Sequence, residues 1–166
     1  MISKVVEEAI NKQIKEEFYS AYLYLAMSGY FESINLKGFA NWMFVQYQEE
    51  MAHAMKLYEH LKNRGGRLKL YAIPEPPHEW ASPLDAFRAT LEHERHITRC
   101  INELIDLVEK EKDRPAYNML QWFVDEQVEE EANDEEIIAQ LEMIGDNKHG
   151  LMMLDRELAR RKLEEE

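Results

Sequence analysis

The chain has 166 residues, of which 33 are acidic and 20 basic, so its formal net charge is -13. This length suits one domain with a sound core. The acidic balance argues against nucleic acid or an anionic membrane as a partner, because phosphate contacts require Lys and Arg. The single cysteine, Cys100, excludes an intramolecular disulfide and fits a reducing cytoplasm, where we interpret it as a small hydrophobe. We expect neither export nor a membrane span, since no signal peptide or long apolar run is present.

Helix signals dominate, because Gly and Pro total only 11 and cluster between long periodic segments. Ser82 and Pro83 form a helix start, while Gly65 and Gly145 form helix stops. The predicted helices cover about residues 4–33, 37–63, 83–112, 114–144 and 147–162 of a single domain, 1–166.

The links between these helices predict the topology. Short links near residues 34–36 and 113 make antiparallel hairpins. The segment 66–82 can reach roughly 55 Å when extended, which exceeds the roughly 40 Å length of the second helix. We therefore predict an all-α four-helix bundle with one long crossover and a short fifth helix at the carboxyl end. A flexible linker or a lid is the alternative for this segment, although Tyr71 and Trp80 favour packing.

Each long helix has an apolar stripe that is interrupted near its middle by acids or amides. In the second helix the stripe runs Leu36, Phe39, Met43, Gln46, Glu50, His53, Leu57 and Leu61. The interruptions elsewhere are Glu17, Glu94, Gln127, Glu130 and Asp134. No Lys or Arg falls on these stripes, so buried bases cannot neutralise the acids. Burying an unpaired carboxylate costs several kcal/mol, which predicts a compensating cation.

An internal repeat supports this prediction. An offset of 77 residues maps Glu17 onto Glu94, Glu50 onto Gln127 and His53 onto Glu130. In both halves, the first acid precedes the second-helix pair by 33 residues. Helix rise then places all six residues near the middle of the bundle.

Oxygen ligands with one imidazole suit iron or manganese, and the lack of thiolates disfavours structural zinc. We interpret the six residues as a two-metal site bridged by Glu50. Glu17 and His53 complete one ion, and Glu94 and Glu130 complete the other, with Gln127 as a weak or hydrogen-bonding neighbour. Because only the first ion has a histidine, we expect the second to be held more weakly. Tyr24 fits an ordinary core aromatic as readily as a hydrogen-bonding neighbour, and Trp122 fits packing.

The Glu50-Met51-Ala52-His53 segment resembles the Glu-x-x-His motif of ferritins, specifically the haem-free prokaryotic kind, over essentially the whole chain. Gln127-x-x-Glu130 replaces a second Glu-x-x-His, which disfavours relatives with two histidines. No haem is expected, since Ala52 stands where bacterioferritins carry methionine.

The resemblance implies an iron-storage ferroxidase that oxidises Fe(II) to Fe(III) with O2 and deposits mineral in a hollow cage of 24 subunits. It implies two iron ions per centre, held by Glu17, Glu50, His53, Glu94 and Glu130, with Gln127 beside them and Tyr24 assisting. It also matches a third iron position to Glu49, Glu126 and Glu129, for which a solvated acidic face is the other interpretation.

Two rival functions stay open at this point. One is a di-metal oxidase or peroxidase acting on a small organic substrate, which needs a cavity where Phe123 and Leu91 are bulky. The other is a non-catalytic helical assembly protein whose acids are incidental.

Overall fold

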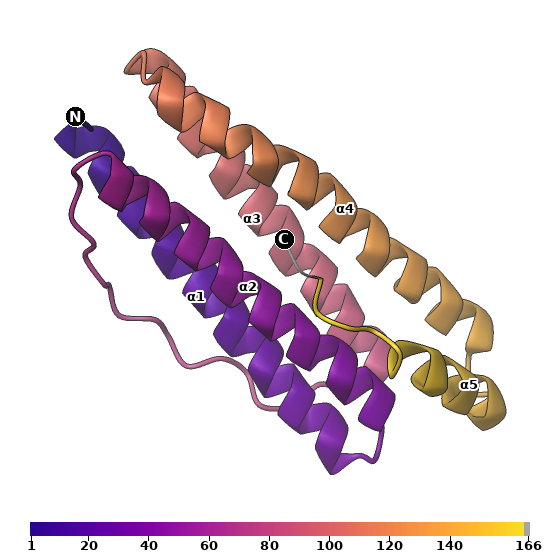
Figure 1. The fold of residues 1–166 in the computed structure, drawn as a ribbon. Coiled ribbons are helices and arrows are strands. Elements are labelled where there is room, and N and C mark those ends of the chain that lie inside the picture. Colours follow the sequence, from indigo (N-terminus) through magenta and orange to yellow (C-terminus); the bar gives the residue numbers. More distant parts are fainter. Residues whose placement is uncertain (165–166) are drawn as a thin grey trace.

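The computed structural model describes residues 1–164 and, over that range, contains five helices and no strand. The elements are α1 (Lys4–Ser33), α2 (Lys37–Asn63), α3 (Pro83–Lys110), α4 (Arg114–Ile144) and α5 (Lys148–Leu158). The first four lie side by side as a long bundle, and α5 folds back at the end of α4 (Figure 1). The predicted all-α bundle with a short fifth helix is confirmed.

Side chains cap the helices where the sequence predicted starts. Ser82 Oγ accepts from Asp85 N at 3.1 Å, and Asp113 Oδ1 accepts from Ala116 N at 3.0 Å. Two helices end earlier than predicted. Helix α3 ends at Lys110, and Lys112 takes a left-handed φ of 56° in the turn to α4. Helix α5 ends at Leu158 instead of residue 162.

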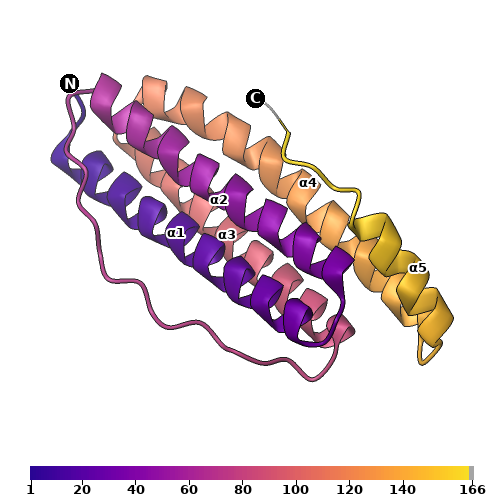
Figure 2. The ribbon, with the colours of Figure 1, turned by 60° about the horizontal axis from the view of Figure 1, so that its bottom comes forward.

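The crossover is the segment 64–82, which runs along the outside of the bundle for most of its length (Figures 1 and 2). It brings the start of α3 to the end where α2 begins, so α2 and α3 are parallel as predicted (Figure 1). Asn11 on α1 holds the loop by donating to Arg67 O at 2.9 Å and accepting from Lys69 N at 2.8 Å. Trp80 packs edge-on against Tyr30 at 5.4 Å between ring centroids.

The core has two apolar clusters, one toward each end of the bundle. The first, here the aliphatic cluster, contains Ile10, Ile14, Leu57, Leu61, Ile101 and Leu120. The second, here the aromatic cluster, contains Phe31, Phe39, Trp42 and Phe87, whose rings meet at 5.2–6.2 Å. Burial of this apolar surface is the main stabilisation of the bundle.

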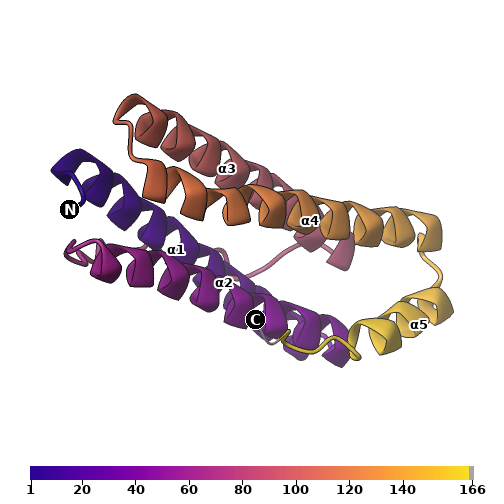
Figure 3. The ribbon, with the colours of Figure 1, turned by 45° about the horizontal axis from the view of Figure 1, so that its top comes forward.

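Helix α5 closes one end of the bundle against the start of α2. Asp155 Oδ1 accepts a hydrogen bond from Phe39 N at 2.9 Å. A Cβ on Gly38 would lie only 1.6 Å from Asp155 O, so the two helices can approach only because residue 38 is glycine. The segment after α5 continues alongside α2 (Figure 3). None of the described helices is both long and apolar enough to cross a membrane.

Candidate metal centre

A layer of buried polar side chains separates the aliphatic and aromatic clusters. The structure brings together in this layer all six residues that the repeat pointed to: Glu17 from α1, Glu50 and His53 from α2, Glu94 from α3, and Gln127 and Glu130 from α4. Each is at most 4% exposed. Four helices therefore contribute polar groups to one water-poor site.

The first ligand group consists of Glu17, Glu50 and His53, whose ligand atoms lie within 4.8 Å of one another. His53 Nδ1 lies 3.1 Å from Glu50 Oε2 and 3.9 Å from Glu17 Oε2. The α2 pair is three residues apart, so both side chains project from one face of the helix. Two carboxylates and an imidazole can hold one cation here.

The second ligand group consists of Glu50, Glu94 and Glu130, again within 4.8 Å. Glu50 belongs to both groups, so a carboxylate with two oxygens lies between two ligand sets. The second set contains oxygen ligands only. This sharing is the geometry that a bridging role for Glu50 requires.

The two ligand groups also differ in the hydrogen bonds that their carboxylates accept. In the second group, Glu94 accepts from Tyr24 OH at 2.5 Å and from Gln127 Nε2 at 3.1 Å. In the first group, Gln13 Nε2 donates to Glu17 Oε1 at 3.2 Å, but no donor among the described residues reaches Glu17 Oε2. A buried acceptor without a donor is costly, and a cation removes that cost.

Burial and mutual repulsion raise the pKa values of the acids in the centre. Burial, followed by repulsion from Glu50, raises the pKa of Glu17 well above its ordinary value. Burial and the Glu94 charge do the same to the pKa of Glu50 and of Glu130. Without a cation these carboxyls therefore keep their protons to a higher pH than free carboxyls do, because charged neighbours in a low-dielectric core repel one another.

Gln46 and Arg161 support the centre, and neither was assigned a role from the sequence. Gln46 Nε2 donates to Glu50 Oε1 at 3.0 Å and to Glu130 Oε2 at 2.8 Å. Arg161 Nη2 donates to Gln46 Oε1 at 2.9 Å, which orients the amide so that its NH2 group faces the acids. Gln46 could have been suspected from its place on the α2 stripe. Arg161 could not, because it lies beyond α5.

Asp134 is a further buried acid, and sequence reasoning placed it on the α4 stripe without a role. It is 1% exposed, and neither of its carboxyl oxygens has a hydrogen-bond partner in the described chain. Burial and the neighbouring Glu94 charge raise its pKa well above the ordinary value. It therefore adds, beside the second ligand set, a carboxyl that keeps its proton to a higher pH than usual.

The three acids matched to a third metal position lie on the α2 and α4 side of the centre. Glu49, Glu126 and Glu129 line one cavity of about 90 Å³ together with Arg161. Arg161 Nη2 lies 2.9 Å from Glu49 Oε2, so this acid is already paired. Glu126 instead forms a candidate ligand group with His53 and Glu130. A neighbouring cavity of about 160 Å³, lined by Glu49, His53 and Glu126, reaches the centre itself.

Comparisons with known proteins show the family of the chain. Residues 7–144 match the ferritin-like domain family. The chain is 42% identical to a bacterial non-heme ferritin of Bacteroides fragilis, over 97% of this chain and 100% of that protein. It is 38% identical to a bacterial non-heme ferritin of Staphylococcus haemolyticus over the full length of both.

Solved structures show the same likeness. The open-pore ferritin from the hyperthermophilic archaeon Archaeoglobus fulgidus superimposes with a TM-score of 0.97 and 54% identity, covering 98% of this chain and 100% of that one. A closed form of the same ferritin, engineered by site-directed mutagenesis, gives a TM-score of 0.98 and 53% identity, with coverage of 99% and 100%.

Proposed function

This chain belongs to the ferritin family as an iron-storage ferritin of the prokaryotic non-haem kind, and from that premise we propose that its buried centre is a ferroxidase site. Fe(II) is the substrate. Two Fe(II) ions each give one electron to O2, which takes up two protons to form hydrogen peroxide, and the Fe(III) passes on to mineral.

The proposed ligands follow the two groups described above. Glu17, Glu50 and His53 hold the first iron, and Glu50, Glu94 and Glu130 hold the second. Carboxylates stabilise Fe(III) over Fe(II) because hard oxygen anions favour the higher charge. Gln127 and Tyr24 orient Glu94 through their hydrogen bonds, and Gln46 orients Glu50 and Glu130.

The observation that carries the proposal is the shared Glu50, which joins two ligand groups in a core whose interrupted stripes carry no Lys or Arg to neutralise the acids. The acidic cavity beside His53 supports passage of cations between the centre and the α2 and α4 side. At about 160 Å³ it is smaller than the roughly 300–1,000 Å³ of typical organic-ligand pockets, which disfavours the oxidase alternative.

The remaining parts of the proposal concern the assembly and its setting. We place residues 1–166 in one domain that associates with copies of itself into a 24-subunit shell in the cytoplasm, with ferric mineral inside. The family and its cage-forming members support a homo-oligomer. Glu49, Glu126 and Glu129 are proposed as a third iron position, in which the pairing of Glu49 Oε2 with Arg161 competes with iron binding.

Metal-free protein mixed with Fe(II) in air tests this proposal. We expect fast oxidation that continues beyond two irons per chain and leaves soluble mineral inside uniform hollow particles in electron micrographs. Oxidation that stops at stoichiometry would instead indicate an oxidase, and no acceleration over buffer would leave only an assembly protein.

The variant Glu50→Ala removes the shared ligand and should abolish fast oxidation while the helical content stays unchanged. Glu59→Ala is the matched control, because Glu59 lies on the same helix and pairs with Lys62 at the surface. Retention of fast oxidation in Glu50→Ala would exclude the bridging role.

A further inference from the structure

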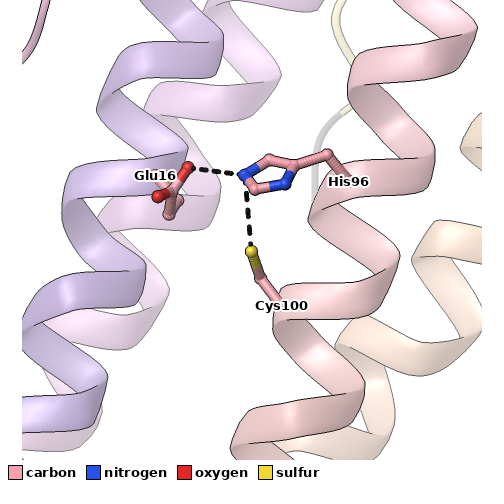
Figure 4. A group of neighbouring side chains, drawn as sticks. All are labelled: Glu16, His96 and Cys100. Atoms are coloured by element: carbon pink, nitrogen blue, oxygen red, sulfur yellow. Dashed lines mark hydrogen bonds and ion pairs between the residues drawn. The ribbon is translucent and has the colours of Figure 1, made fainter.

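A second group of metal-binding side chains lies outside the centre, where α1 packs against α3. Glu16 from α1 meets His96 and Cys100 from α3 (Figure 4). His96 Nε2 lies 3.2 Å from Glu16 Oε2 and 3.5 Å from Cys100 Sγ. Glu16 precedes the buried Glu17 by one residue, so it points about 100° away from the centre.

These distances suit a tetrahedral cation. Zinc binds sulfur at about 2.3 Å, nitrogen at about 2.0–2.1 Å and oxygen at about 2.0–2.2 Å, so tetrahedral edges are about 3.6 Å for nitrogen to sulfur and about 3.4 Å for nitrogen to oxygen. The observed 3.5 Å and 3.2 Å are close to these edges. His96 and Cys100 are four residues apart and share one face of α3. Two of the three edges therefore match a tetrahedral site, and all three ligand atoms lie within 4.8 Å of one another.

The donor set selects a different metal from the centre. A thiolate, an imidazole and a carboxylate are the ligands of zinc-class cations, whereas the centre offers carboxylates and one imidazole. The nearby His93 is not part of this ligand group, and its Nε2 lies 2.7 Å from Ser20 Oγ. The group is partly open, with the His96 side chain 44% exposed and that of Glu16 27% exposed, so water can fill a fourth position.

The local charge also favours a cation. Burial and the carboxylates of Glu16 and Glu103 raise the pKa of the Cys100 thiol to about 11. The free thiol is therefore neutral, and a bound cation must displace its proton. The same negative potential that discourages a thiolate attracts a divalent ion.

We propose that Glu16, His96 and Cys100 bind one zinc-class divalent cation per chain, with water as the fourth ligand. The ion links α1 to α3 and so ties one helical hairpin to the other. This site is independent of the ferroxidase proposal, because it shares no residue with the centre.

Cobalt(II) added to the fully reduced, assembled protein tests the site. A thiolate-to-cobalt charge-transfer band reports this site alone, since Cys100 is the only cysteine and the centre has no sulfur ligand. We expect one equivalent of this band per chain, its displacement by Zn(II), and its loss in Cys100→Ser. A cobalt spectrum without the band would overturn the proposal.

A matched pair of variants checks the role of Glu16. Glu16→Gln should weaken the affinity for cobalt, measured by titrating the charge-transfer band, by about 10-fold or more. Glu103→Gln removes the same charge near Cys100 but lies outside the group, and it should leave the affinity within about twofold. Equal weakening in both variants would mean that charge alone attracts the ion, and it would contradict ligation by Glu16.

Thermal unfolding gives an independent measurement. Zinc should raise the unfolding midpoint of the wild type more than that of Cys100→Ser, because an ion that binds only the folded state stabilises it. Equal rises in the two proteins would place all bound zinc in the centre and overturn the proposal.

Discussion

The α1–α2 and α3–α4 hairpins repeat one design, yet they treat their central acids differently. In the first hairpin, Glu17 Oε2 has no donor among the described residues. In the second, both oxygens of Glu94 accept hydrogen bonds, one from Tyr24 and one from Gln127. Gln127 occupies the repeat position of Glu50, so an amide donor stands where the first half has a carboxylate.

This difference predicts that the two ligand groups bind an ion with different free energies. An ion in the first group removes an unsatisfied acceptor and gains an imidazole, whereas an ion in the second competes with hydrogen bonds that the acids already make. The first position should therefore bind tightly and the second should bind and release its ion more readily. Release from the second position suits a centre that passes its product on.

The largest expected effect is a loss of metal affinity when one hairpin loses an acid that belongs to a single ligand group. Glu17→Gln should weaken the first binding step by at least about 100-fold, because even outer partners of metal ligands cost about 10–100-fold. Glu94→Gln should weaken only the second step. Anaerobic calorimetric titration of metal-free protein with Fe(II) measures both steps, and loss of the same step in both variants would contradict the asymmetry.

The next largest effect is a dependence of the free energy of unfolding on pH, since burial raises the pKa of Glu17, Glu50 and Glu130. Above the ordinary carboxyl value of 4.5 the folded metal-free protein holds more protons at these three groups than the unfolded chain does, although burial lowers the pKa of His93 to about 4 and removes one proton there. Its free energy of unfolding should therefore be highest below that pH and fall as pH rises, by about 1.4 kcal/mol per pH unit for each extra proton.

Urea unfolding between about pH 5 and pH 7, with a chelator present, measures this slope. Saturation with metal should reverse it, because the ions require deprotonated carboxylates. A metal-free stability that rises over this range would show that the acids are not held protonated.

A smaller effect is expected from Tyr24→Phe, which removes a donor to Glu94. The metal-free protein should lose about 1–3 kcal/mol of stability, because a buried acceptor loses its partner. The Fe(II) affinity of the second binding step should change, while that of the first step should not. Tyr22→Phe is the control on the same helix, since Tyr22 is 48% exposed. Equal losses in stability would mean that the hydroxyl of Tyr24 contributes nothing specific.

The smallest effect is expected from Arg161→Gln, which frees the Gln46 amide to rotate. We expect a loss of about 1–2 kcal/mol from the broken charged hydrogen bonds and a modest weakening of the second binding step. Arg160→Gln provides the comparison, because Arg160 pairs with the exposed Glu157. An unchanged second step in calorimetry would show that Gln46 keeps its orientation without Arg161.

Much of the fold and of the centre could be predicted from local patterns. Helix periodicity located the stripes, and the cost of burying acids among apolar residues singled out Glu17, Glu50, His53, Glu94 and Glu130, which the structure brings together. The tail after α5 could not be predicted. Residues 159–162 continue a helical pattern, but Arg161 gains more by stacking on Trp42 at 4.1 Å and pairing with Glu49.

The sequence by itself determined the helices, their order and the acids that had to meet, because 3.6-residue periodicity and the cost of burying charge depend on the local chain. Only the tertiary structure decided which donor serves which oxygen, and that Glu16 meets His96 and Cys100. Those contacts depend on how neighbouring helices are rotated and shifted relative to one another, and residues 80 positions apart carry no local signal of that arrangement.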